Sequence, residues 1–137
     1  MIDQVNSEKG LIEFIGKVES VVKEGRTEDS ILEKISKHVD YFLKNHANSI
    51  PESYRQPNKE KYVLYPLYID PDERFSISSA VWDVGQSTPV HDHGMWGVIG
   101  ILQGKELEKR YVNRDKKDVV TIEMVEERLL AEGEVKV

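Results

Sequence analysis

The side chains with the most chemically suggestive spacing are His91 and His93, which are separated by a single residue. In an extended strand, side chains two positions apart point to the same face, so both imidazoles can face one metal ion while Asp92 points away. Neutral imidazole suits iron, zinc and copper, and this spacing suits two neighbouring positions on one ion. A histidine pair on a surface strand is about as often only a polar face, so both interpretations stay open at this point.

Glycines are spaced regularly around the pair. Five residues lie between Gly85 and His91, three between His93 and Gly97, and six between Gly97 and Gly104. This is the spacing of the first cupin motif. Within the cupins, the chain resembles the thiol dioxygenases, the group of cysteine dioxygenase and 3-mercaptopropionate dioxygenase. The resemblance covers about half of the chain and rests on residues 87–93, 96–100 and 102–104, with 65–68, 70–72, 74–76 and 81–82 upstream and 108–111 downstream.

The resemblance implies a mainly β fold with N-terminal helices, namely a cupin double-stranded β-helix, or jelly roll. It implies Fe(II) as the cofactor, with other divalent metals as alternatives, and His91 and His93 as ligands. The implied reaction oxidises a small thiol, 3-mercaptopropionate or cysteine, to its sulfinate with dioxygen. Three facial protein ligands would leave open positions at which thiolate and dioxygen lie side by side. No residue is assigned a catalytic role.

Several positions depart from the patterns of other cupins. Gly97 stands where many cupins carry a ligating Glu, which implies a site of three histidines. The chain has no Cys, so the Cys–Tyr cross-link of some cysteine dioxygenases cannot form, and residues 61–70 lack the Arg that binds the substrate carboxylate in those enzymes. The missing Cys and the missing Arg both favour the 3-mercaptopropionate branch. The residues expected to line the substrate pocket are Trp96, Tyr65, Tyr68 and Gly97, with core packing as the alternative for the aromatic ones.

The third histidine of the family comes from a second motif, expected beyond the segment that residues 129–137 match. The remaining histidines, His38 and His46, fall in the predicted helical region and are expected to be polar surface. We therefore expect a jelly roll that is incomplete at its C-terminal side, with open strand edges that pair in a homodimer. Two other hypotheses stay open. One is a non-catalytic cupin-like module that binds a small ligand or a protein, and the other is a self-associating remnant with a vestigial histidine pair and an empty metal site.

Composition limits the class of protein. The 137 residues include 19 Lys and Arg against 25 Asp and Glu, giving a formal charge of −6. This length suits a single domain over 1–137, with a helical cap at 1–57 and a partial cupin barrel at 58–137. The acidic balance argues against nucleic acid or an anionic membrane as partner. Cysteine, a signal-peptide pattern and a long apolar run are all absent, so we expect a cytoplasmic protein.

Hydrophobic periodicity predicts helices followed by strands. Helical spacing covers 7–24 and 28–45, with Thr27 as the N-cap of the second helix, and 51–57 is expected to be a turn or short helix. From residue 61 the period changes to two. Strands are predicted at 62–68, 75–81, 96–102, 106–112 and 119–130, with the histidine pair on a strand, a turn at 70–73 and a solvated charged turn at 115–118.

Overall fold

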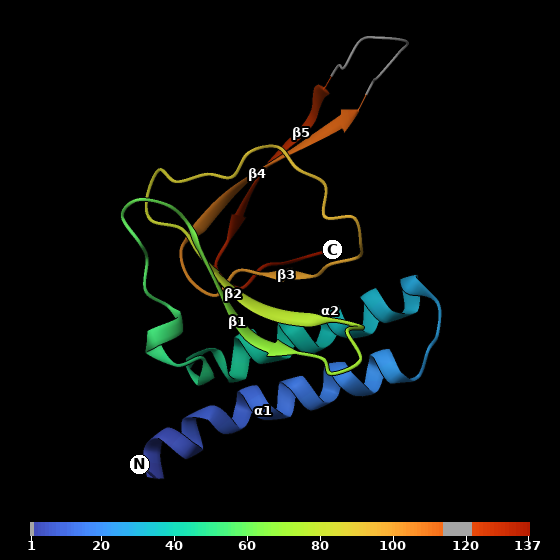
Figure 1. The fold of residues 1–137 in the computed structure, drawn as a ribbon, viewed down its shortest axis with the longest axis vertical. Coiled ribbons are helices and arrows are strands. Elements are labelled where there is room, and N and C mark those ends of the chain that lie inside the picture. Colours follow the sequence, from blue (N-terminus) through green and yellow to red (C-terminus); the bar gives the residue numbers. More distant parts are fainter. Residues whose placement is uncertain (1, 114–121) are drawn as a thin grey trace.

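Two helices form one side of the molecule (Figure 1). The computed structural model describes residues 2–113 and 122–137, with side chains from residue 8 onward. Helix α1 (Ile2–Lys23) and helix α2 (Glu28–Asn45) lie against each other, as the periodicity predicts. The Thr27 hydroxyl accepts a hydrogen bond from the Ser30 N–H at 3.3 Å, which confirms the predicted N-cap of α2. None of the described helices is long and apolar enough to cross a membrane.

Two short 3₁₀ helices, η1 (Ala47–Ser49) and η2 (Glu52–Tyr54), lead from α2 to the strands. The strands form three antiparallel pairs. Strand β1 (Val63–Ile69) pairs with β2 (Ser76–Val81), and β3 (Ile99–Gly100) pairs with β6 (Val135–Lys136). Strand β4 (Lys105–Asn113) pairs with β5 (Ile122–Ala131) in a hairpin that extends away from the helices (Figure 1).

The predicted strands at 62–68, 75–81 and 106–112 are confirmed, as is the turn at 70–73. No closed barrel forms among the described strands, and the predicted charged turn at 115–118 lies outside the described residues. One strand prediction is wrong. Only Ile99–Gly100 of the predicted 96–102 strand forms a paired strand, and the histidine pair lies on the irregular segment 82–98 instead of a strand.

Glycine conformations explain why segment 82–98 does not pair as a strand. Gly85 has a φ of 86° and Gly94 a φ of 68°, in the left-handed region that interrupts an extended chain. The Gly94 N–H, which a ladder would need, donates instead to the Asp92 side chain at 2.8 Å. The alternation rule therefore does not apply to this segment.

The core lies between the helices and the strands. One buried cluster joins α1, α2 and the residue before β2, and a second joins the middle of α1 and the last turns of α2 to the residue after η1. Partly buried side chains from β1, segment 82–98 and β6 pack against the first cluster. The first cluster contains Val18, Val21, Ile35, Val39 and Phe75, and the second contains Leu11, Phe42 and Ile50.

Two glycines of α1 should respond to alanine with opposite signs. A Cβ at Gly10 would lie 2.5 Å from Ser49 Oγ and 2.6 Å from the His46 ring, whereas a Cβ at Gly16 would meet nothing within 4 Å. We expect Gly10→Ala to lower the free energy of unfolding by about 1–3 kcal/mol through overpacking. Gly16→Ala should raise it by roughly 0.5–1 kcal/mol because alanine is the better helix former. Urea denaturation of both variants measures this difference, and equal effects would contradict the close approach at Gly10.

Candidate metal centre

His91 and His93 converge, although neither lies on a strand. Their Nε2 atoms are 3.0 Å apart, their ring centroids are 4.9 Å apart, and the ring planes are inclined by 56°. Both side chains are exposed, so an ion can reach them from solvent. A turn closed by Gly94, and not strand alternation, brings the two rings together.

Backbone contacts fix the orientation of the His91 ring. Its Nδ1 lies 2.7 Å from the carbonyl oxygen of Pro89. Because a carbonyl only accepts, Nδ1 must carry the proton, which leaves Nε2 of the neutral ring with a free lone pair. A ring N–H that donates to a carbonyl is a usual outer contact of metal-binding histidines. Without a metal, His93 Nε2–H can donate to this lone pair.

The separation of the two nitrogens fits a metal. Adjacent ligands at right angles, each about 2.1 Å from an ion, have nitrogens about 3.0 Å apart. The observed Nε2–Nε2 distance of 3.0 Å therefore matches two cis positions. Within residues 2–113 and 122–137 no group of three His, Cys, Asp or Glu side chains could hold an ion. Among the described residues, the pair therefore offers two candidate ligands and no third side chain beside them.

The aromatic residues predicted to line the substrate pocket each contact a different part of the molecule. Trp96 packs against the core cluster of Val18 and its neighbours, from the same segment as the histidines. The Tyr65 hydroxyl donates to the carbonyl oxygen of Gln56 at 2.6 Å, beyond η2. The Tyr68 ring lies 5.6 Å from the Phe75 ring. Burial raises the pKa of the Tyr68 hydroxyl, and nearby carboxylates add to this effect.

Gly97 differs from these aromatic residues because it is exposed and has empty space beside its Cα atom. A Cβ at this position would meet nothing within 4 Å. The position at which many cupins carry a ligating Glu therefore has room for a side chain in this chain, and glycine is not required there for packing.

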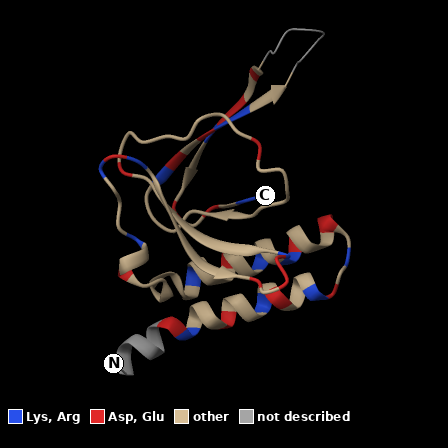
Figure 2. Cartoon of the chain, viewed as in Figure 1, with Lys and Arg blue, Asp and Glu red and all other residues tan. Residues whose placement is uncertain are grey.

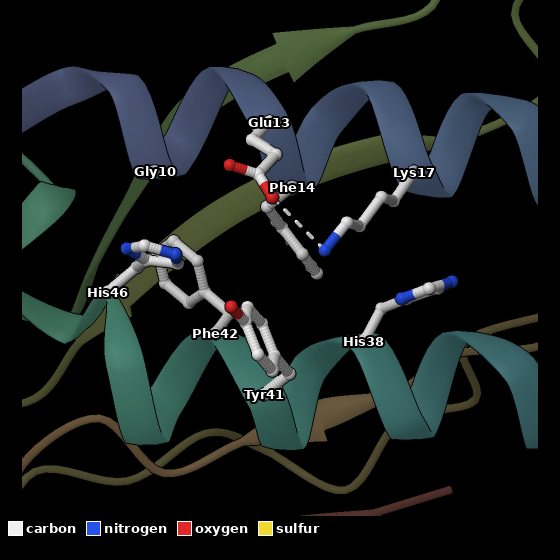
Figure 3. Close-up of a pocket in the computed structure, with 8 residues that line it drawn as sticks. All are labelled: Gly10, Glu13, Phe14, Lys17, His38, Tyr41, Phe42 and His46. Atoms are coloured by element: carbon white, nitrogen blue, oxygen red, sulfur yellow. Dashed lines mark ion pairs between the residues drawn. The ribbon is translucent and has the colours of Figure 1, made fainter.

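The other two histidines line a small hollow between α1 and α2 (Figure 3). His46 packs near the rings of Phe42 and Tyr41, and His38 points away from it along α2. Burial, followed by the charge of Lys17, lowers the pKa of His38. The hollow holds about 10 Å³, the lower limit for a single water molecule, so it is too small for a substrate.

The face of β4 that carries Glu106 and Glu108 holds a charged group that the sequence pattern does not reveal. Lys136 Nζ lies 2.7 Å from Glu108 Oε1, and the Lys136 side chain is only 10% exposed. Glu106 is half-buried on the same face, and burial, with the charge of Glu108, raises the pKa of its carboxyl. The alternation of Glu106 and Glu108 with Leu107 indicates that the two carboxylates share one face of β4. It does not indicate which face of the strand points inward.

No model of a known protein family matches the chain. The functional assignment therefore depends on the spacing of the histidine motif and on the geometry of the pair.

Proposed function

We propose that this chain is a cupin-type relative of the thiol dioxygenases and that it binds Fe(II) through His91 Nε2 and His93 Nε2. The observation that carries the proposal is the 3.0 Å separation of the two nitrogens, which matches cis ligands. The Pro89 carbonyl supports it because it holds His91 in the tautomer that binds metal. The spacing from Gly85 to Gly104 is that of the first cupin motif. The antiparallel hairpins are also of the kind from which a jelly roll is built.

The proposed reaction converts a small thiol, 3-mercaptopropionate or cysteine, and dioxygen into the sulfinic acid. Both oxygen atoms are transferred to sulfur, which loses four electrons as dioxygen gains four, so no other reductant is needed. Bound iron would supply the electron redistribution and hold the two reactants close together. His91 and His93 would fix two positions of the ion, and their exposure leaves the remaining side open to substrate.

A second candidate is a non-catalytic cupin-like module that binds a small ligand or another protein. This candidate is favoured because, within the described residues, no third side chain lies beside His91 and His93 to complete a metal site. Two imidazoles hold an ion more weakly than the three protein ligands of an ordinary catalytic site. The two candidates differ in whether iron binds tightly enough to be retained.

The decisive experiment is anaerobic titration calorimetry of the purified chain with Fe(II). We expect binding of about one ion per chain in the wild type and loss of specific binding in His91→Ala/His93→Ala. The variant His38→Gln/His46→Gln removes the same number of histidines from the helical region, so it should bind iron as the wild type does.

The iron-loaded chain would then be tested for oxygen consumption with 3-mercaptopropionate, cysteine or cysteamine. Thiol-dependent oxygen uptake with formation of the sulfinate is the expected result. Iron binding without oxygen uptake would contradict the catalytic proposal and favour the non-catalytic binding module. Equal iron binding by the wild type and His91→Ala/His93→Ala would overturn the assignment of the metal site itself.

A further inference from the structure

The β4–β5 hairpin has two different faces. On one face, Glu106 and Glu108 of β4 are partly buried and Leu130 of β5 is only 1% exposed, although Arg110, further along the same face, is exposed. The opposite, outer face carries cross-strand pairs that are all exposed. These pairs, in order along β4, are Leu107 with Leu129, Lys109 with Glu127, and Tyr111 with Met124.

The outer face is unusual for a surface that meets water. Leu107 and Leu129 are 52% and 56% exposed, and Tyr111 and Met124 are 39% and 48% exposed. Ile122 and Val125 of β5 are also exposed. An antiparallel hairpin ordinarily presents polar residues to solvent, and several large apolar side chains gathered on one exposed face mark an interaction site. A two-stranded hairpin is also only marginally stable by itself, so covering this face would stabilise it.

The pattern of the outer face is complementary to itself. A charged pair of opposite sign lies between two apolar pairs, and basic and acidic bands can be followed along both strands in Figure 2. Within the described part of the chain, neither Lys109 nor Glu127 forms an ion pair, so both charges are available to a partner.

Charge selects how two such faces would meet. A two-fold axis parallel to the strands places Lys109 over the partner's Glu127 and Leu107 over the partner's Leu129. The same rotation places Tyr111 over the partner's Met124. An axis across the strands would place Lys109 over the partner's Lys109, which is repulsive. Face-to-face sheets of this kind pack about 10 Å apart with nearly aligned strands.

We propose that the outer face of β4–β5 is the interface of a homodimer whose two-fold axis runs parallel to the strands. The occupant is a second copy of this chain, since the same patch supplies both halves of each contact. This interface uses the face of the hairpin, whereas the sequence suggested pairing through strand edges. It does not depend on the proposed metal site. Because the contact is made by one face of a two-stranded hairpin, we expect a weak dimer whose population depends on concentration.

Sedimentation equilibrium over a series of protein concentrations tests the interface. The wild type should approach the mass of a dimer as concentration rises. Lys109→Glu alone and Glu127→Lys alone should each shift the chain to monomer, because each places like charges opposite one another. The double variant Lys109→Glu/Glu127→Lys should recover the dimer, and a mixture of the two single variants should form a heterodimer.

Leu129→Ser should also weaken the dimer, whereas Leu64→Ser, at an equally exposed leucine of β1, should not. Circular dichroism melts show whether each variant is folded. A wild type that stays monomeric at every concentration would overturn the proposal, as would a dimer that neither charge reversal weakens. His91→Ala/His93→Ala should keep the dimer, so failure of the metal assignment is distinguishable from failure of this interface.

Discussion

Asp70→Asn is expected to lower the midpoint of thermal unfolding by about 5–10 °C. Asp70 begins the β1–β2 turn with a side chain that is 1% exposed. Its carboxylate accepts from Arg74 Nε at 2.8 Å, from Arg74 Nη2 at 3.1 Å and from the Arg74 backbone N–H at 3.0 Å. Asparagine has nearly the same shape but no charge, and its amide cannot accept all three bonds. The turn would keep its backbone conformation and lose the ion pair with Arg74 that holds it most firmly.

The effect of Asp70→Asn should depend on pH. The Arg74 side chain, which donates two of these bonds, holds the pKa of the Asp70 carboxyl below its ordinary value. A lowered pKa in the folded state stabilises the protein above the unfolded pKa of about 3.9. That stabilisation is lost as the pH falls through the folded pKa. The difference in midpoint between wild type and variant should therefore be constant near neutral pH and shrink in acid.

Asp72→Asn is the matched control for this prediction. Asp72 lies in the same turn, 3.8 Å from Arg74, but its side chain is 79% exposed. An exposed pair at that distance contributes little, so the variant should melt close to the wild type at every pH. Equal losses for Asp70→Asn and Asp72→Asn in thermal melts would show that burial of the Asp70 carboxylate is not the cause.

The helices and hairpins could be predicted because local signals agree with the packing. Thr27 provides a cap, the apolar positions of α2 repeat at helical spacing, and Asp70 begins a turn between two alternating segments. The grouping of Leu107, Lys109 and Tyr111 on one face also follows from alternation along β4. These features depend on residues near one another in the chain.

Features that depend on the detailed backbone geometry of a loop, or on which face of a hairpin is buried, could not be predicted in the same way. The positive φ of Gly94 and the hydrogen bond to Asp92 remove the histidine pair from a strand, and period-two alternation gives no sign of this. The orientation of the His91 ring comes from its hydrogen bond to the Pro89 carbonyl oxygen, which depends on the local backbone conformation. Alternation along β4 likewise identifies two faces without showing that the face with Glu106 is the one that meets the body.

One end of the β4–β5 hairpin packs inward through Leu130. Leu130, at 1% exposed, is among the most deeply buried side chains of the described residues, and it pairs with Glu106 on the inner face. We expect Leu130→Ala to reduce the free energy of unfolding by about 2–5 kcal/mol because it removes buried apolar contacts and leaves a cavity. Leu64→Ala deletes the same atoms at a position 59% exposed, so its cost should stay below about 1 kcal/mol.

Chemical denaturation of the two variants also bears on the proposed dimer. A large loss at Leu130 would mean that the hairpin is fixed to the body through its inner face, which leaves Leu107, Leu129 and their neighbours available to a partner. Similar losses for Leu130→Ala and Leu64→Ala would mean that the hairpin does not pack on the body in this orientation. The distinction between an inner and an outer face would then fail, because Leu130 marks the side of the two strands that meets the body.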